Sequence, residues 1–200
     1  MPEHPFLSLL QPEGVPHPSW SIAAGTLTMD APPRSDLFVN PSANDGDLPA
    51  LGRLVATVEG DFMFSARVEA DIREFGDAGV LYVEYDEQLW FKFCLECTPK
   101  GEPSVVSVVT RGTSDDANSW ILDHPRSYFR VSRRGAGFAL HASTDGAYWV
   151  LVRHFSLGIP PTVPVKVGFL AQSPVGEGAR ATFSEVSLVH ATLADLRDGS

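Results

Sequence analysis

The amino-acid sequence predicts an all-β protein, in which two sheets form a sandwich or one sheet closes into a barrel. Apolar and polar residues alternate with the two-residue period of a strand in about a dozen short segments, and no segment carries a long helical period. Glycine and proline gather between these segments, where turns are needed. Many short strands with few helices are typical of sandwiches and barrels.

The first expected strands follow a proline-rich stretch at the start of the chain. Residues 20–31 are expected to form a strand or a pair of strands. Residues 32–52 are expected to form a loop, because Pro, Asn, Asp and Gly dominate it. Residues 54–72 are expected to form two strands about "EGD", and residues 80–96 a hairpin whose two apolar runs are joined by "DEQ".

The second half of the chain continues the same pattern. It contains, in order, a strand (103–112), the polar loop "TSDDANS" (113–119), a short strand (120–123), three strands (128–155), two further strands (165–174 and 179–190) and a tail (191–200). The Asp145-Gly146 step is a strong hairpin signal within the group of three. No internal repeat and no second domain is apparent, so residues 1–200 are expected to form one domain.

Composition excludes several classes of function. The formal net charge is −10 and the sequence pI is about 4.9, which argues against a nucleic-acid partner, since such binding needs clustered Lys and Arg. No apolar stretch approaches the roughly 20 residues of a membrane span. The N-terminus lacks the basic start and long apolar run of a secretory signal. The six histidines show no metal-ligand spacing, and no cofactor-binding motif is present, so neither a metal nor a cofactor is expected.

The two cysteines, Cys94 and Cys97, form the sequence "CLEC". They lie in an alternating strand, where residues three apart are separated by roughly 10 Å and face opposite sides. A disulfide needs Cα atoms within about 7 Å, and structural zinc needs four ligands. We therefore expect two reduced, structural thiols, which suits a reducing compartment such as the cytoplasm.

The hairpin at residues 80–96 has one apolar face and one mixed face. Its odd-numbered residues before the turn and after it are apolar or aromatic, so they should face the core. A turn at Glu87-Gln88-Leu89 would place Glu84 opposite Lys92 as a cross-strand charge pair. Glu84, Asp86, Glu87 and Glu96 form a group of carboxylates beside Trp90.

The mixed face is predicted to be the floor of a ligand site. Aromatic rings suit the C–H faces of a sugar, and charged groups suit its hydroxyls. The same pattern is also typical of a solvated outer face with ordinary ion pairs. The predicted ligand-binding residues are Tyr82, Glu84, Trp90, Lys92 and Glu96 on the hairpin, Arg111, Arg130 and His141 on neighbouring strands, and Trp120 as a wall.

The order of several segments resembles a known family. These segments are "GDFMFSARVEA", "DAGVLYVEYDEQLWFKFCLE", "SVVTRGTSDDANSW", "YFRVSRRGAGFALHASTDGAYWVLVRHF" and "KVGFLAQSP". Together they resemble domain-of-unknown-function family 1349, which includes the regulation-of-enolase protein and belongs to the concanavalin A-like lectin/glucanase superfamily. The resemblance covers roughly residues 15–190 and implies a two-sheet antiparallel jelly-roll sandwich with a concave face. It implies no reaction, since a fold does not fix a function.

The sequence leaves three functions open. The first is a non-catalytic domain that binds a carbohydrate or another small polar ligand. The second is a glycoside hydrolase or lyase that uses Glu84 and Glu96, although the glucanase pattern E-x-D-x-x-E is incomplete, because Leu89 stands where its third acid belongs. The third, which comes only from the family's enolase-regulation member, is a regulatory domain that binds a metabolic protein.

Overall fold

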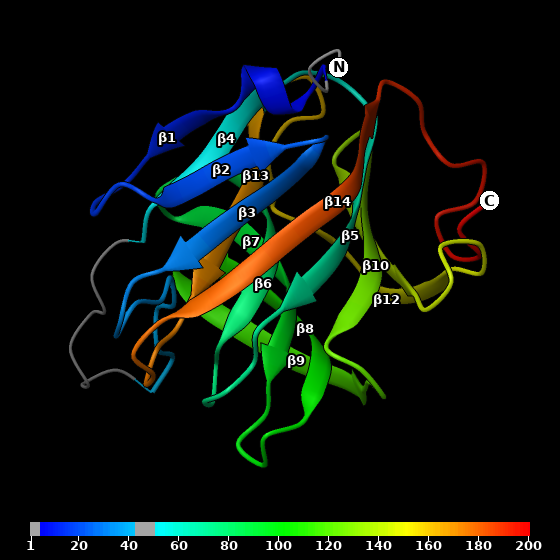
Figure 1. Ribbon diagram of the computed structural model, residues 1–200. Coiled ribbons are helices and arrows are strands. Elements are labelled where there is room, and N and C mark those ends of the chain that lie inside the picture. Colours follow the sequence, from blue (N-terminus) through cyan, green and yellow to red (C-terminus); the bar gives the residue numbers. More distant parts are fainter. Residues whose placement is uncertain (1–4, 43–50) are drawn as a thin grey trace.

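A computed structural model describes residues 5–42 and 51–200. It contains two antiparallel sheets of seven strands each, packed face to face as a jelly-roll sandwich, which confirms the predicted fold class (Figure 1). One short 3₁₀ helix, Leu7–Leu9, precedes the first strand. Residues 43–50, which belong to the predicted loop, lie outside the described residues.

The sheet that lies behind in Figure 1 is called sheet A. It carries the predicted hairpin at its centre, as strands β6 and β7. In spatial order its strands are β1 (Gln11–Glu13), β4 (Arg53–Val58), β13 (Val165–Gln172), β6 (Ala78–Asp86), β7 (Leu89–Cys97), β8 (Pro103–Arg111) and β9 (Thr113–Ile121).

The sheet in front is called sheet B. Half of its neighbouring pairs join strands that are distant in sequence, as in β5 beside β14. In spatial order its strands are β12 (Val150–Ser156), β11 (Gly137–Ser143), β10 (Arg126–Arg134), β5 (Phe62–Ala70), β14 (Ala179–Val189), β3 (Thr26–Ala31) and β2 (Ser19–Ala23).

The main core lies between the sheets and follows the predicted alternation. In β5, Phe62, Phe64 and every second residue after them are buried, while the intervening residues are partly exposed. Aromatic rings join the two sheets, since Phe93 of sheet A stacks on Phe129 of sheet B at a centroid distance of 4.1 Å. Burial of this apolar surface is the main force that holds the sandwich together.

One predicted loop is wrong. Residues 113–119, expected to be a polar loop, continue into the expected short strand and form the single strand β9. β9 pairs with β8 alone among the described strands, so it is an edge strand. An edge strand has one solvated side and tolerates the polar residues that suggested a loop.

Two arginines tie the β9 edge of sheet A to the β12 edge of sheet B. Arg111 at the end of β8 donates from Nε to the carbonyl oxygen of Ser156 at 3.1 Å. From sheet B to sheet A, Arg153 of β12 pairs with the carboxylate of Asp115 in β9 at 3.1 Å. These polar contacts close one side of the sandwich in addition to apolar packing by Trp120, Val152 and Phe155.

Candidate functional site

The structure divides the nine predicted ligand-binding residues among three places, so the prediction of one continuous floor is wrong. Five remain together, two face the space between the sheets, and two lie on the other sheet. On the outer face of sheet A are Tyr82, Glu84, Trp90, Lys92 and Glu96; toward the main core are Arg111 and Trp120; on the outer face of sheet B are Arg130 and His141.

Strand register explains the misplaced residues of sheet A. Arg111 is directly opposite Leu89, so it shares the core-facing side of the sheet and points away from Lys92. Near Trp120 a β-bulge between Ser104 and Val106 shifts the pairing of β8 with β9, and the indole packs against the main core.

Arg130 and His141 are misplaced because alternation along a strand does not reveal which sheet the strand joins. The two residues are direct partners across β10 and β11, as neighbouring positions on one face. Both strands belong to sheet B, however, and the core-facing residues Phe129 and Leu140 alternate with them. The predicted neighbours therefore lie on opposite outer faces of the sandwich.

The hairpin keeps the predicted faces away from its turn but differs in register, and Tyr85, predicted to face the core, is 40% exposed. Glu84 is opposite Trp90 and Tyr82 is opposite Lys92, a shift of two residues from the expected pairing. The turn contains only Glu87 and Gln88, and a bulge between Glu84 and Asp86 absorbs the extra residue. The predicted Glu84–Lys92 charge pair is therefore wrong, since each residue has a different partner.

A segment of the chain crosses the outer face of sheet A, and we call residues 35–39 the strap. One end is fixed beside β13, where Ser35 and Ser173 exchange two backbone hydrogen bonds of 3.0 Å. The other end is fixed at β9, where Ser114 donates its backbone N–H to the carbonyl of Val39 at 2.9 Å. Because β6, β7 and β8 lie between these two points, the strap passes over the predicted ligand floor.

The strap changes what the predicted floor can offer. Leu37, Phe38 and Val39 pack against an apolar cluster on this face that includes both aromatic rings of the prediction. Tyr82 and Trp90 are only 1% and 2% exposed. They are therefore buried packing groups, and the prediction that they present open rings to a sugar is wrong.

Lys92 stands at the centre of a buried polar group beneath the strap. Its Nζ donates to Oδ1 of Asp36 and to Oε1 of Gln172, both at 2.8 Å. Burial lowers the pKa of Lys92, but the charge of Asp36, with those of Cys94 and Glu96, outweighs burial and leaves this pKa raised. The lysine is therefore charged at neutral pH, and we call Asp36, Lys92, Glu96 and Gln172 the polar cluster.

Glu84 belongs to a separate ion network at the other end of the hairpin. It accepts a hydrogen bond from the Tyr82 hydroxyl at 2.9 Å and pairs with Arg53 at 2.8 Å and Lys166 at 3.5 Å. Burial, followed by the charge of Glu84, holds the pKa of Tyr82 well above its usual value. A carboxylate held by two cations is a structural anchor for β4, β6 and β13.

Glu96 is the most chemically distinctive residue on this face. Burial raises its pKa to about 7, even though Lys92 lowers it, and Asp36 and Asp116 raise it further. The side chain is partly exposed, and its Oε2 lies 3.5 Å from Nε2 of Gln172. A carboxyl group that is about half protonated at neutral pH both donates and accepts hydrogen bonds.

The strand register argues against Glu84 and Glu96 as a catalytic pair. Glu84 is opposite Trp90, so it lies six residues along the strand direction from Glu96, a distance of about 20 Å. Glycosidases place their two carboxyl groups about 5–9.5 Å apart. The predicted alternative of hydrolysis through these two residues is therefore wrong.

Metals and thiols add no further chemistry to the site. No group of three or more His, Cys, Asp or Glu residues within residues 5–42 and 51–200 could hold a metal ion. Cys94 and Cys97 are buried free thiols, as predicted. No helix in this described part of the chain is long and apolar enough to cross a membrane.

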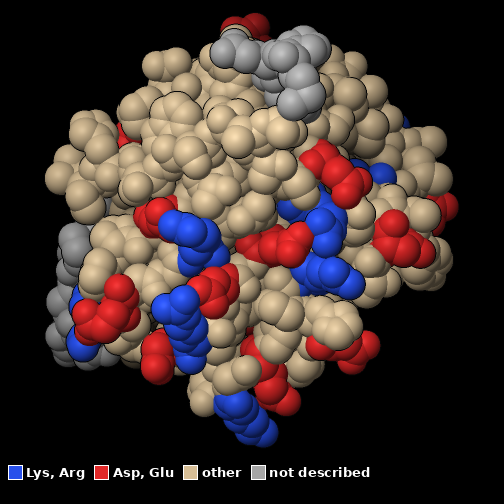
Figure 2. Space-filling view, viewed as in Figure 1, with Lys and Arg blue, Asp and Glu red and all other residues tan. Residues whose placement is uncertain are grey.

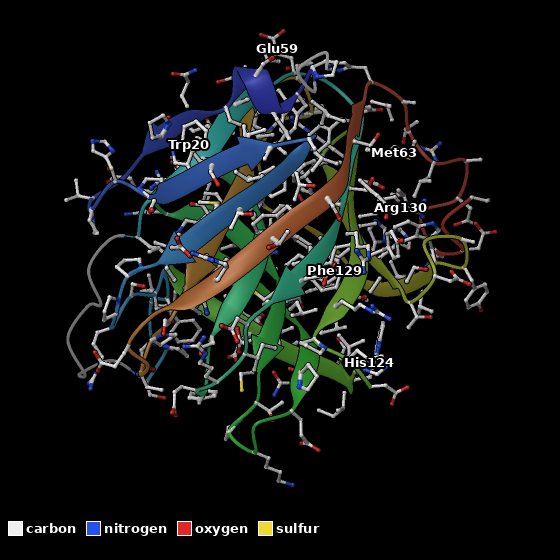
Figure 3. All side chains as sticks on the ribbon, viewed as in Figure 1. Trp20, Glu59, Met63, His124, Phe129 and Arg130 are labelled. Atoms are coloured by element: carbon white, nitrogen blue, oxygen red, sulfur yellow. The ribbon has the colours of Figure 1, made fainter. Side chains whose placement is uncertain are left out.

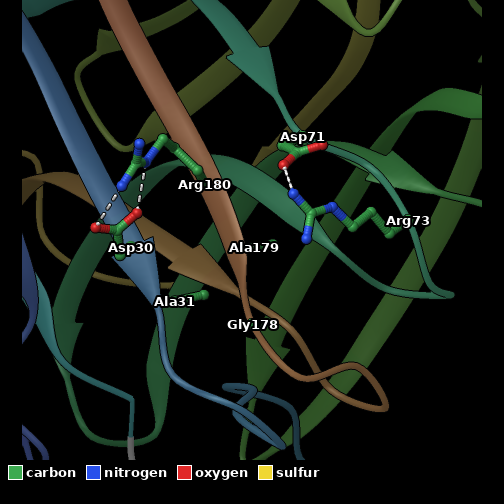
Figure 4. A pocket seen from close by; sticks show the side chains of 7 residues that line it. All are labelled: Asp30, Ala31, Asp71, Arg73, Gly178, Ala179 and Arg180. Carbon is green, nitrogen blue, oxygen red and sulfur yellow. Dashed lines mark hydrogen bonds and ion pairs between the residues drawn. The ribbon is translucent and has the colours of Figure 1, made fainter.

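A pocket of about 370 Å³ lies on the opposite sheet, at the ends of β3 and β14 (Figure 4). Arg180 donates to both carboxylate oxygens of Asp30, at 2.7 and 3.1 Å, and Arg73 pairs with Asp71. Basic and acidic side chains also lie beside one another across the middle of this face (Figure 2). Since the charges that line this pocket pair with one another, it offers a ligand less than the polar cluster does.

Sequence reasoning missed the strap and the residues that it adds to the site. Asp36 lies in the predicted loop at residues 32–52, and Gln172 lies in the predicted strand at residues 165–174. One signal was available, because "DLFV" places three apolar residues in succession inside a loop otherwise rich in Pro, Asn and Gly. Such a run in a loop indicates that the loop packs against something.

Comparison with known proteins supplies a family but no activity. A family model described as "Protein of unknown function (DUF1349)" matches residues 15–191. No curated protein matches the chain. A crystal structure of a functionally unknown protein from Saccharomyces cerevisiae is similar with a TM-score of 0.81 and 24% identity, over 92% of this chain and 98% of that chain.

Other similar structures include a GH43 protein and a carbohydrate binding module. A GH43 protein from Bacillus licheniformis matches with a TM-score of 0.67 and 13% identity, over 86% of this chain but only 35% of its own length. The carbohydrate binding module CBM66 from Bacillus subtilis matches with a TM-score of 0.53 and 13% identity, over 94% of this chain and 99% of the module. At these identities the likeness concerns the fold alone.

Proposed function

Because the chain belongs to the DUF1349 family of unknown function, we propose a function from its own site: it is a non-catalytic module that binds a saccharide on the outer face of sheet A, beside the strap. The observation that carries this proposal is the polar cluster, which places a charged lysine and a half-protonated carboxyl group in fixed positions. Groups held in position before binding lower the entropic cost of holding a ligand.

The surroundings of Glu96 suit the hydroxyl groups of a sugar. Asp116 and Asn118 of β9 are exposed on the same face of the sheet, opposite Val108 and Val106 of β8. Carboxyl and amide groups supply the donors and acceptors that the hydroxyl groups of a pyranose ring require. The ligand would therefore contact Glu96, Asp116 and Asn118, while Gln172, whose Nε2 lies 3.5 Å from Oε2 of Glu96, orients the carboxyl group.

Two comparisons are consistent with this proposal. CBM66 is described as a carbohydrate binding module and has nearly the same extent as this chain. The GH43 protein is matched over about a third of its length, as expected if this chain resembles one part of a larger carbohydrate-active protein. That the ligand is a saccharide is our inference from the chemistry of the polar cluster.

The test is to screen the chain against a panel of neutral and acidic saccharides and to measure the affinity of each hit by calorimetry. Glu96→Ala is expected to weaken binding about tenfold, because it removes the hydrogen-bonding group, and even a neutral hydrogen bond contributes up to about 1.5 kcal/mol. The matched control is Glu102→Ala, which makes the same change in the exposed β7–β8 turn and should leave affinity unchanged. Binding that survives Glu96→Ala unaltered, or a panel with no hit, would contradict the proposal.

A further inference from the structure

The C-terminal segment lies against the outer face of sheet B, on the side of the labelled residue Arg130 (Figures 1 and 3). Leu193 anchors it and is only 5% exposed. Beyond this anchor, side chains of β10 and β11 donate hydrogen bonds to its backbone carbonyls. These are Arg134 Nη1 to Ala194 at 3.1 Å, His141 Nε2 to Leu196 at 2.9 Å and Arg130 Nη2 to Gly199 at 2.7 Å.

The groups beneath this segment form a built site. The guanidinium of Arg130 lies over the ring of Trp149, with 4.3 Å between its Cζ and the ring centroid. His141, directly opposite Arg130 in the strand pairing, is fully buried. Burial and the neighbouring Arg130 charge lower the pKa of His141 to about 4, so its ring is neutral at pH 7.

The C-terminal segment satisfies this site incompletely. Arg130 Nε, His141 Nδ1 and Ser132 Oγ are buried and have no hydrogen-bond partner among the described residues. A carbonyl oxygen only accepts, so Nε2 of His141 carries its proton and Nδ1 is left as an unused acceptor. Three such atoms gathered under one segment are unusual, since buried polar groups are nearly always paired.

The unpaired Nε of Arg130 indicates which ligand would bind here better than the Gly199 carbonyl does. Nε and Nη2 form one edge of a guanidinium, and that edge matches the two oxygens of a carboxylate. Arg180 of this same chain uses these two atoms on Asp30, at 2.7 and 3.1 Å. Arg130 instead gives Nη2 to one neutral carbonyl and leaves Nε unpaired.

We infer that the outer face of sheet B is a binding site for a carboxylate ligand, and that residues 196–199 occupy it as an internal competitor. The carboxylate would take both donors of the Arg130 edge in place of the Gly199 carbonyl. A hydroxyl group beside that carboxylate would donate to Nδ1 of His141. The site is independent of the proposed saccharide site, which lies on the other outer face of the sandwich.

Gly199 provides a way to weaken the competitor without truncating the chain. Its φ is +81°, a left-handed conformation that residues with a side chain rarely adopt. A Cβ at this position would lie 2.7 Å from Nη2 of Arg130 and 3.3 Å from Cδ2 of His141. Gly199→Ala should therefore loosen residues 196–199 while Leu193 and the sheet stay in place.

The experiment is a titration of the full-length chain with glucuronate, followed by NMR chemical shifts, with glucose as the neutral control and acetate as the carboxylate without hydroxyls. Glucuronate is expected to bind Gly199→Ala at least about fivefold more tightly than the wild type, because loss of the competitor raises the fraction of competent sites. Gly101→Ala is the matched control, since Gly101 has φ +79° but its Cβ would meet nothing within 4 Å. It should bind as the wild type does.

Two further variants decide the role of Arg130. In the Gly199→Ala background, Arg130→Gln should weaken glucuronate binding by about tenfold or more, and Arg130→Lys should recover only part of it, because lysine keeps the charge but lacks the two-donor edge. If acetate binds as tightly as glucuronate, the proposed contact between the carboxylate and Arg130 is supported, and the proposed hydroxyl contact to His141 is refuted. The inference is overturned if Gly199→Ala binds no more tightly than the wild type, if binding survives Arg130→Gln, or if glucose binds equally well.

Discussion

Lys92, on the outer face of sheet A, is a charged residue with only 1% of its surface exposed. Its position is stable because Asp36 and Gln172 accept its hydrogen bonds. A buried charge that loses its partner is costly, whereas an apolar pair of similar volume can replace a buried ion pair at little cost. The strap is therefore fixed to the sheet by electrostatic contacts as well as by apolar packing.

Lys92→Met should lower the free energy of unfolding by about 3 kcal/mol, because it leaves Asp36 without its cation beneath the strap. Urea unfolding measures this change. The double variant Lys92→Met with Asp36→Leu should be more stable than Lys92→Met alone. Lys100→Met, in the exposed β7–β8 turn, is the matched control and should change stability by less than about 0.5 kcal/mol. Equal losses in the single and double variants would contradict this account.

Glu96 should make stability fall as the pH rises. Its pKa is about 7 in the folded chain and near 4.5 when unfolded, so between these values the folded state holds a proton that the unfolded state has lost. Stability then decreases from pH 4.5 to pH 7. The free energy of unfolding of the wild type minus that of Glu96→Gln should therefore fall across this range. Above about pH 8 this difference should not change further.

His141 should have the opposite effect on the pH dependence of stability. Its pKa is about 4 in the folded chain against 6.5 when unfolded, so between these values the unfolded state binds the proton and stability rises with pH. The difference between the wild type and His141→Gln should therefore grow from pH 4 to pH 6.5. A rising difference for Glu96→Gln, or a falling one for His141→Gln, would show that these groups are not held as described.

The residue pairings were the least predictable part of the sequence. The alternation of "VLYVEYDEQLWFKFCLE" correctly assigned the side chains to faces except beside the turn, where Tyr85 is exposed and Asp86 is opposite Leu89. The pairing of Glu84 with Lys92 failed, because a bulge of one residue and a turn of two residues preserve the faces while shifting the register. The partners of Lys92 come from residues 56 and 80 positions away, which no local pattern reveals.

At the scale of the strands, β9 shows how polarity misleads. Its residues "TSDDANS" have the composition of a loop, yet they pair with β8 along nearly its whole length. An edge strand needs such residues, since charges discourage pairing with other chains. The choice between loop and edge strand depends on whether a neighbouring strand is present, and this is a property of the assembled sheet.

The close approach of strands β4 and β13 leads to a prediction about stability. Gly168 of β13 lies where a Cβ would come within 1.9 Å of the Leu54 carbonyl oxygen in β4. Gly168→Ala should lower stability by about 3 kcal/mol or more, because the two paired backbones must separate. Gly137→Ala at the start of β11, whose nearest atoms are at 3.5 Å, should change stability by less than about 1 kcal/mol. Thermal unfolding compares the two, and similar melting temperatures would refute the proposed clash.

At the scale of the whole molecule, the class of fold was predictable and the membership of each sheet was not. About a dozen alternating segments with turns between them lead to a β-sandwich or barrel, and the family resemblance selects the jelly roll. Alternation does not tell whether β10 lies beside β8 or beside β5, however, because both arrangements bury Phe129. For this reason Arg130 was assigned to the wrong face.

The two thiols should report on unfolding of the entire sandwich. Cys94 and Cys97 are 0% and 1% exposed, and burial raises the pKa of both thiols. An alkylating reagent should therefore modify neither thiol in the native chain and both in denaturant, at a rate that follows global unfolding. Mass spectrometry counts the modified sites. Rapid labelling of one cysteine under native conditions would mean that part of sheet A opens separately.

The acidic edge at β9 has a consequence for the protein in concentrated solution. Asp115 and Asp116 stand on a strand whose outer hydrogen-bonding groups could otherwise template a second molecule. Their charge, together with the net charge of −10, keeps copies apart at neutral pH. As the pH falls toward the pI of about 4.9, this colloidal repulsion fades while the strand remains intact. Turbidity and light scattering should then rise, and they should rise at a higher pH when Asp116 is replaced by Asn.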